Sequence, residues 1–76
     1  EDDHYIVKIE IHANHHDTPL RQLMNQVPEI KVLLHKRGTE IQHIVDLELL
    51  LKEGDILVVE GLLEPLRRLS KHFKAI

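Results

Sequence analysis

Histidine is the residue type in this sequence that most readily suggests chemistry, with seven copies in 76 residues. Three of them, His12, His15 and His16, stand together in the stretch HANHHD. Neutral imidazole nitrogens bind zinc, nickel and copper, and one loop can bring three rings together. The sequence has no cysteine to complete such a site. We therefore interpret the three histidines mainly as exposed loop residues, and a divalent metal site is the alternative.

Candidates for catalysis are few. The only serine, Ser70, falls in the middle of an expected helix and lacks a strained glycine turn around it. Glu53 and Asp55 are spaced for acid and base work, but they flank Gly54, and a glycine turn predicts exposed carboxylates with ordinary pKa values. We predict that the chain has no catalytic residues and is not an enzyme.

The composition limits the class of protein. A net charge of -3, with one Tyr, one Phe and no Trp, lacks the basic field and the stacking aromatics of most nucleic-acid binders. We therefore expect no direct nucleic-acid binding. The chain is 42% hydrophobic and 30% charged, and its longest apolar runs are far shorter than the roughly 18 residues of a membrane span. We expect residues 1–76 to form one domain, not itself embedded in a membrane and held together by packing alone.

The first third of the chain predicts a strand followed by a helix. Apolar residues at every second position from Tyr5 to Ile11 indicate a strand over residues 4 to 12 with one buried face. Thr18 is placed to cap a helix of about two turns that starts at Pro19 and ends before Pro28.

The remainder predicts three strands and a second helix. Residues 30 to 36 and 39 to 44 are expected to form a hairpin around Arg37 and Gly38, with His35 and His43 on its surface. Residues 46 to 54 are compatible with a helix that Asp46 caps and Gly54 ends, or with an extended segment around Leu49 to Leu51, and we favour a mostly extended segment. Residues 56 to 59 are all apolar, which indicates a central strand covered on both faces and ended by Gly61. An amphipathic helix follows, with Leu62, Leu66, Leu69 and Phe73 on its apolar side.

These elements define the expected fold class. We predict an α+β domain with a small mixed or antiparallel sheet of about four to five strands, in the order β-α-β-β-β-α. A sheet of this size with a leucine-rich face gains core by pairing with a copy of itself, so we also expect a homodimer.

The order of motifs resembles the C-terminal subdomain of regulators of potassium conductance, also called the TrkA-C domain, over nearly the whole chain. The segments that carry the resemblance are DTPLRQL, VLLHKRGTEIQHI, LKEGDILVVEG and LEPLRRLSKHF. Within them the family pattern is matched by Gly54 and Asp55 before an apolar strand that ends at Gly61. It is also matched by Leu20 with Leu23 on the first helix and by Arg37 with Gly38 in the hairpin.

Two positions depart from the family pattern. The family usually has glycine where Asp17 stands, and often proline after the hairpin where this chain has His43 and Ile44. The resemblance also implies a ligand site, because some members bind cyclic di-AMP at a dimer interface near the end of the first helix. The matching residues here are Asn25, Gln26, Val27, Pro28 and Ile30. This segment lacks the basic residue that often accompanies the site, and Glu29 would repel phosphates.

The resemblance implies a function in cation transport. It predicts a cytoplasmic, ligand-sensing and dimerising domain of a potassium channel or a cation transporter or antiporter, excised from a longer protein at the inner or plasma membrane. The implied ligand is cyclic di-AMP or another small nucleotide. Two alternatives are an effector-binding module of a transcription regulator and a metal-binding module that uses the histidine loop.

Overall fold

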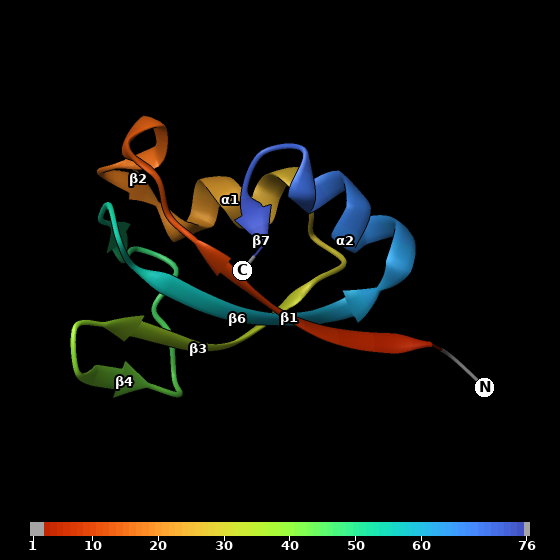
Figure 1. Ribbon diagram of the computed structural model, residues 1–76, viewed down its shortest axis with the longest axis horizontal. Helices are drawn as coiled ribbons and strands as arrows, with labels where there is room; N and C mark the ends of the chain where they lie inside the picture. Colours follow the sequence, from red (N-terminus) through yellow and green to blue (C-terminus); the bar gives the residue numbers. More distant parts are fainter. Residues whose placement is uncertain (1–2, 76) are drawn as a thin grey trace.

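A five-stranded antiparallel sheet forms the centre of the fold (Figure 1). The structure is a computed structural model that describes residues 3–75. The strands lie in the order β4-β3-β6-β1-β7, so the neighbours of the central strand come from distant parts of the sequence. Their bounds are β1 (His4–Glu10), β3 (Lys31–Arg37), β4 (Glu40–Gln42), β6 (Ile56–Leu62) and β7 (Lys74–Ala75).

Two helices lie on the same face of this sheet (Figure 1). They are α1 (Leu20–Gln26) and α2 (Leu63–Ser70). The short strands β2 (Thr18–Pro19) and β5 (Leu50–Leu51) pair in a second sheet, and a 3₁₀ turn, η1, covers Ala13–His15. The longer elements follow the order β-α-β-β-β-α, which confirms the predicted α+β class. No helix within residues 3–75 is long and apolar enough to span a membrane.

The hydrophobic core lies between the helices and the inner face of the sheet. The alternation in β1 and β6 sends every second side chain to this side, where the side chains meet the apolar stripes of both helices. The buried apolar residues are Ile9, Ile11, Leu20, Leu23, Val27, Ile30, Leu51, Leu57, Val59, Leu66, Leu69 and Phe73.

β6 is the central strand, as the sequence predicts, but only one of its faces is covered. Leu57 and Val59 are fully buried under the helices, whereas Ile56 and Val58 are only partly buried on the opposite face. The prediction of a doubly covered strand is therefore wrong for the single chain. Residues 56 to 59 are apolar on both faces of the strand, but the helices of this chain cover only one of these faces.

Several predicted boundaries shift because tertiary pairing overrides local signals. β1 ends at Glu10, not at residue 12. Thr18 does not cap α1; it pairs with Leu51 in the second sheet, and Pro19 occupies the cap position without a side-chain hydrogen bond. Residues 46 to 54 contain β5 and a turn, so the extended prediction holds only in part. The hairpin between β3 and β4 is confirmed, and Gly38 has a left-handed φ of 60° at its turn.

Gly61 does not end β6, which continues to Leu62. A Cβ atom at position 61 would lie 3.2 Å from Cγ2 of Ile30 and 3.7 Å from Cγ of Leu66. The glycine is therefore explained by close packing inside the strand, because any larger side chain would meet the core.

This packing gives a stability prediction. Gly61→Val should lower the free energy of unfolding by about 2 kcal/mol, because the added methyl groups overpack the contact with Ile30. The control is Glu60→Val, which adds the same side chain to the outer face of the same strand. Urea unfolding monitored by circular dichroism measures both. Equal losses of unfolding free energy in the two variants would show that close packing is not the reason for glycine at position 61.

Candidate functional site

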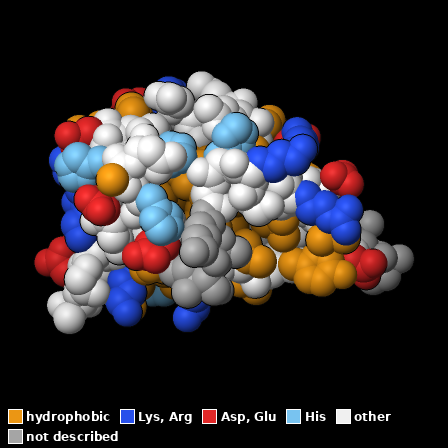
Figure 2. Space-filling model, turned by 45° about the horizontal axis from the view of Figure 1, so that its top comes forward, with side chains coloured by type: hydrophobic (Ala, Val, Ile, Leu, Met, Phe, Trp, Pro, Cys, Tyr) orange, Lys and Arg blue, Asp and Glu red, His pale blue; other side chains and the backbone are white. Residues whose placement is uncertain are grey.

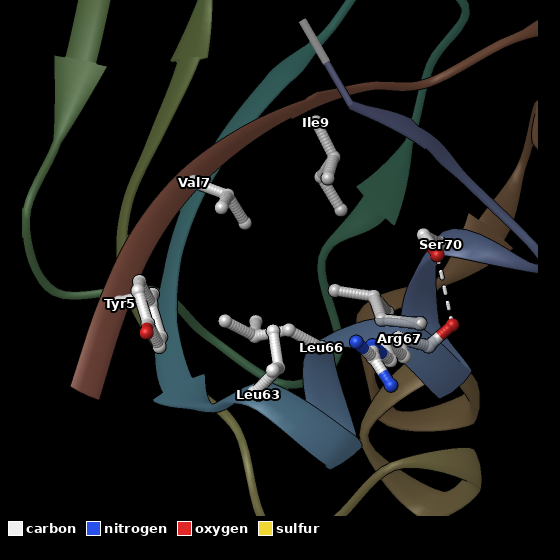
Figure 3. A pocket seen from close by; sticks show the side chains of 8 residues that line it. Tyr5, Val7, Ile9, Leu63, Leu66, Arg67 and Ser70 are labelled. Carbon is white, nitrogen blue, oxygen red and sulfur yellow. Dashed lines mark hydrogen bonds between the residues drawn. The ribbon is translucent and has the colours of Figure 1, made fainter. Parts of the chain in front are cut away.

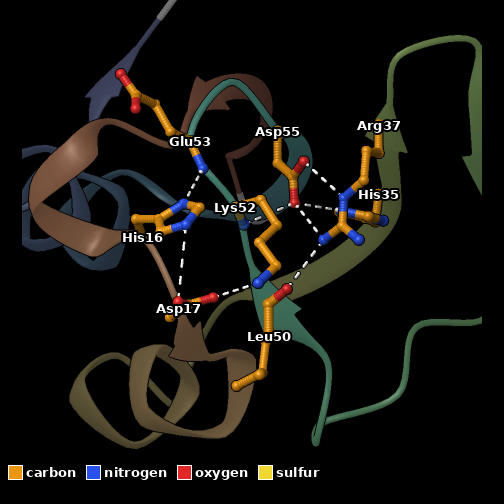
Figure 4. Close-up of polar contacts among 8 residues, drawn as sticks. All are labelled: His16, Asp17, His35, Arg37, Leu50, Lys52, Glu53 and Asp55. Carbon is orange, nitrogen blue, oxygen red and sulfur yellow. Dashed lines mark hydrogen bonds and ion pairs between the residues drawn. The ribbon is translucent and has the colours of Figure 1, made fainter.

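Asp55 is the centre of a buried polar cluster at the start of β6 (Figure 4). Its side chain is held by three residues. Arg37 donates from Nε to Oδ1 at 3.0 Å and from Nη2 to Oδ2 at 2.8 Å. His35 Nε2 lies 2.8 Å from Oδ2, and the amide nitrogen of Lys52 donates to the same oxygen at 3.0 Å. The carboxylate, only 1% exposed, is thus satisfied by a bidentate guanidinium, an imidazole and a backbone amide.

The backbone around Asp55 is fixed as firmly as its side chain. Its carbonyl accepts a hydrogen bond from the amide of Ile11 at 2.8 Å, and the carbonyl of Ile11 accepts one from Gly54 at 2.7 Å. Gly54 has a φ of 91°, a left-handed conformation that turns the chain into β6 and that glycine adopts without strain. The cluster therefore joins the end of β1, the turn before β6 and the hairpin strand β3.

Opposing effects act on the pKa of Asp55. Burial alone would raise this pKa, but the hydrogen bonds from Arg37, His35 and the Lys52 amide outweigh it and lower the pKa to about 2. An ionised carboxylate only accepts hydrogen bonds, so Nε2 of His35 carries a proton. In the neutral ring the other nitrogen, Nδ1, is then an acceptor. It is buried and has no hydrogen-bond partner within residues 3–75.

A small cavity lies beside this histidine. It has a volume of about 50 Å³ and is lined by His35, Arg37, Glu40, Gln42 and Leu49. An acidic residue that orients a histidine, whose second nitrogen remains free, is the arrangement of many general bases and metal ligands. The cavity has room for water, whereas pockets that hold small-molecule ligands usually measure about 300 to 1,000 Å³. We therefore assign the cluster a structural role.

The predicted exposure of Asp55 and His35 is wrong. Asp55 is 1% and His35 is 3% exposed, while His43 is exposed as expected. A glycine turn predicts a solvent-facing loop, but this one folds the carboxylate back under the hairpin. One signal was available: His35 and Arg37 are two residues apart on a strand, so both point to the same face. The sequence alone does not show which acidic residue is buried against His35 and Arg37.

A second feature is an apolar groove between β1 and α2 (Figure 3). Its volume is about 210 Å³, and its lining consists of Tyr5, Val7, Ile9, Leu63, Leu66, Arg67, Leu69 and Ser70. Tyr5 and Leu63 are nearly half exposed at its mouth, and Figure 2 shows apolar side chains gathered near the N-terminal end of the chain. The groove offers an apolar floor with one guanidinium at its rim. Sequence reasoning missed it because it depends on how α2 crosses β1.

The three histidines of the proposed metal loop do not converge. His15 stacks on Phe73 with ring centroids 4.2 Å apart, and Nδ1 of His16 accepts a hydrogen bond from the Glu53 amide at 3.0 Å. His12 is exposed. Within residues 3–75, no three His, Cys, Asp or Glu side chains are placed to hold a metal ion.

The segment with the implied nucleotide site is divided between core and surface. Val27 and Ile30 are buried in the hydrophobic core, whereas Asn25, Gln26 and Pro28 are exposed. Arg68 of α2 donates to Glu29 at 2.6 Å, and this hydrogen bond is the main cause that lowers the pKa of Glu29. A basic group therefore does lie beside the segment, although it comes from the second helix and is paired with a carboxylate.

No protein-family model matches this chain, and comparison with curated proteins gives no match.

The Asp55 cluster predicts how stability depends on pH. Asp55→Asn should lower the free energy of unfolding at pH 7 by about 3 kcal/mol, because the substitution removes the charge that compensates the Arg37 guanidinium. The native pKa lies below the ordinary value of 3.8, so the stabilisation is complete above that value and is lost as the pH falls through about 2. About 2 kcal/mol of the difference from the wild type should vanish between pH 5 and pH 2.

The matched control is Asp17→Asn. Asp17 is also paired with a cation, Lys52, but both side chains are exposed to solvent. Its removal should cost much less, because exposed ion pairs contribute little. Chemical denaturation of both variants from pH 2 to pH 7 makes the comparison. Similar losses at the two positions would contradict the central role given to Asp55.

Proposed function

We propose that this chain is a ligand-sensing, dimerising regulatory domain of a potassium channel or cation transporter, of the kind that its motifs resemble. In such a protein the domain lies on the cytoplasmic side, and the parent protein lies in the inner or plasma membrane. Ligand bound to the domain changes the geometry delivered to the transport portion. The ligand can bias transport only by the difference between its affinities for the two states.

The observation that carries this proposal is a contact between two of the motifs. Arg37 belongs to the Arg-Gly pair of the hairpin, and Asp55 belongs to the Gly-Asp pair before the central strand. The two side chains form a bidentate ion pair in which the carboxylate is buried. The motifs that carry the resemblance are thus parts of one structural unit, which supports their interpretation as a family pattern.

The backbone at Asp17 gives further support. Asp17 has a φ of 64°, the left-handed conformation that glycine adopts most readily. The family usually has glycine at the matching position. Asp17 therefore adopts the backbone conformation that would favour glycine at this position. Aspartate is among the residues that tolerate this conformation best.

The surface at the end of α1 is the part of the chain where we place the ligand. Asn25 and Gln26 are exposed there and offer amide donors and acceptors. Arg68 contacts Glu29, which follows these residues in the same segment. An anionic nucleotide would compete with Glu29 for this guanidinium, so affinity should rise when Glu29 is neutralised.

Calorimetric titration with cyclic di-AMP tests the proposal. The wild-type chain should bind, and Asn25→Ala combined with Gln26→Ala should weaken binding at least about tenfold, the effect of losing one or two hydrogen bonds. Gln22→Ala is the matched control, because Gln22 is an exposed residue of the same helix. Absence of heat with the wild type, or equal effects in all variants, would remove this site from the proposal.

A transport measurement tests the regulatory role directly. In the parent transport protein, removal of these 76 residues should abolish the ligand dependence of potassium flux into proteoliposomes. Basal flux should remain, because the transport pathway would lie outside this domain. A flux whose ligand dependence survives the removal would contradict the proposed function.

A further inference from the structure

The outer face of the main sheet is apolar and uncovered. Both helices lie on the inner face, and the lower side of the sheet in Figure 1 carries no helix within residues 3–75. Ile6 is 64% and Ile41 is 52% exposed on the outer face. A shallow depression of about 420 Å³ lies there, lined by Lys8, Leu34, Lys36, Ile41, Ile56 and Val58.

The sequence of β6 indicates that this face is covered in the working molecule. Strands with one wet face alternate apolar and polar residues, but Ile56 and Val58 continue the apolar run on the outer side. Leu34 is paired directly with Val58 across β3 and β6, so the apolar surface extends over neighbouring strands. A lone exposed leucine needs no explanation, whereas a contiguous apolar face of a sheet does.

The charges on this face have a symmetric arrangement. Lys36 on β3 and Glu10 on β1 are both paired with Ile56, one on each side of the central strand. They therefore lie in one row, in the order Lys36, Ile56, Glu10. Strands β3 and β1 are about 10 Å apart, and no ion pair joins Lys36 to Glu10. Lys74 of β7 is the register partner of Glu10 and continues the row.

We propose that a second copy of this chain covers the outer face, with a twofold axis running along β6. Such a rotation exchanges the two sides of β6, so it lays Lys36 of each copy over Glu10 of the other. Two intermolecular ion pairs then flank a central contact between the two copies of Ile56. The charge pattern is complementary to itself under this rotation, and this self-complementarity favours a second copy over an unrelated partner.

The next rows fit the same packing. Val58 meets its own copy, and Leu34 of one copy faces the aliphatic stem of Lys8 of the other. In the following row Glu60 faces its own copy, but Lys31 is its direct neighbour on β3 and supplies the opposite charge. Facing sheets pack about 10 Å apart, a distance that Lys36 and Glu10 span from opposite sides.

This inference deepens the proposed function, because it rests on the dimerising role and names the surface that performs it. It places the dimer contact on the sheet, on the side opposite to the helices. The ligand segment at the end of α1 then lies outside the central contact. A ligand bound to that segment would have to affect the dimer contact through the packing of α1 on the inner face of the sheet.

A charge-reversal cycle tests the proposal. Sedimentation equilibrium should show that Lys36→Glu and Glu10→Lys each weaken the dimer at least about tenfold, because each places like charges face to face. The double variant should recover dimerisation to within about threefold of the wild type, since it restores both ion pairs in reverse. An equimolar mixture of the two single variants should also associate, because in that mixture opposite charges at positions 36 and 10 can meet only between copies, so its recovery requires contact between copies. Lys71→Glu, a matched reversal in the segment after α2, should leave the dimer unchanged.

Circular dichroism and thermal unfolding of each variant separate loss of association from loss of fold. A dimer that survives both single reversals would overturn the proposed face and leave a dimerising role intact. A wild-type chain that stays monomeric at several hundred micromolar would overturn the face and the proposed dimerisation together. Failure to bind cyclic di-AMP would affect neither result.

Discussion

The buried carboxylate of Asp55 is the interaction on which the rest of this structure depends. It joins Arg37 and His35 on β3 to the turn that starts β6, and its backbone is tied to Ile11 at the end of β1. Three strands of the sheet are thereby fixed in register at one end. A buried charge is costly unless it is fully hydrogen-bonded, and here four donors satisfy it. The cluster thus gives the sheet a specific arrangement that apolar packing alone would leave less well defined.

With one end of the sheet fixed in this way, the two faces have different roles. The inner face packs against α1 and α2 and forms the core, which a chain of this length can make only small. The outer face keeps apolar residues at the positions where a solvent-facing strand would carry polar ones. A domain of this kind is stable enough to fold and also has a surface suited to association. A regulatory module that transmits a change between copies needs both properties.

The proposed function links these features to the motifs. The Arg-Gly and Gly-Asp pairs contact one another through Arg37 and Asp55, and Asp17 keeps a backbone conformation typical of glycine. Each of these short motifs is common by itself, but their contact in the fold supports the interpretation that they form one family pattern. The histidines, the most suggestive residues in the sequence, are instead distributed over separate contacts, such as the stacking of His15 on Phe73.

The sequence by itself determined the α+β class, the order of the long elements, the central position of β6 and most of the core, including Leu66, Leu69 and Phe73. These follow from the period of apolar residues, which local geometry controls. It did not determine that Asp55 and His35 are buried, that Gly61 lies inside a strand, or that one face of β6 is open. Only the tertiary structure decided these points, because each depends on contacts between segments far apart in the chain, such as Arg37 with Asp55 and Gly61 with Ile30.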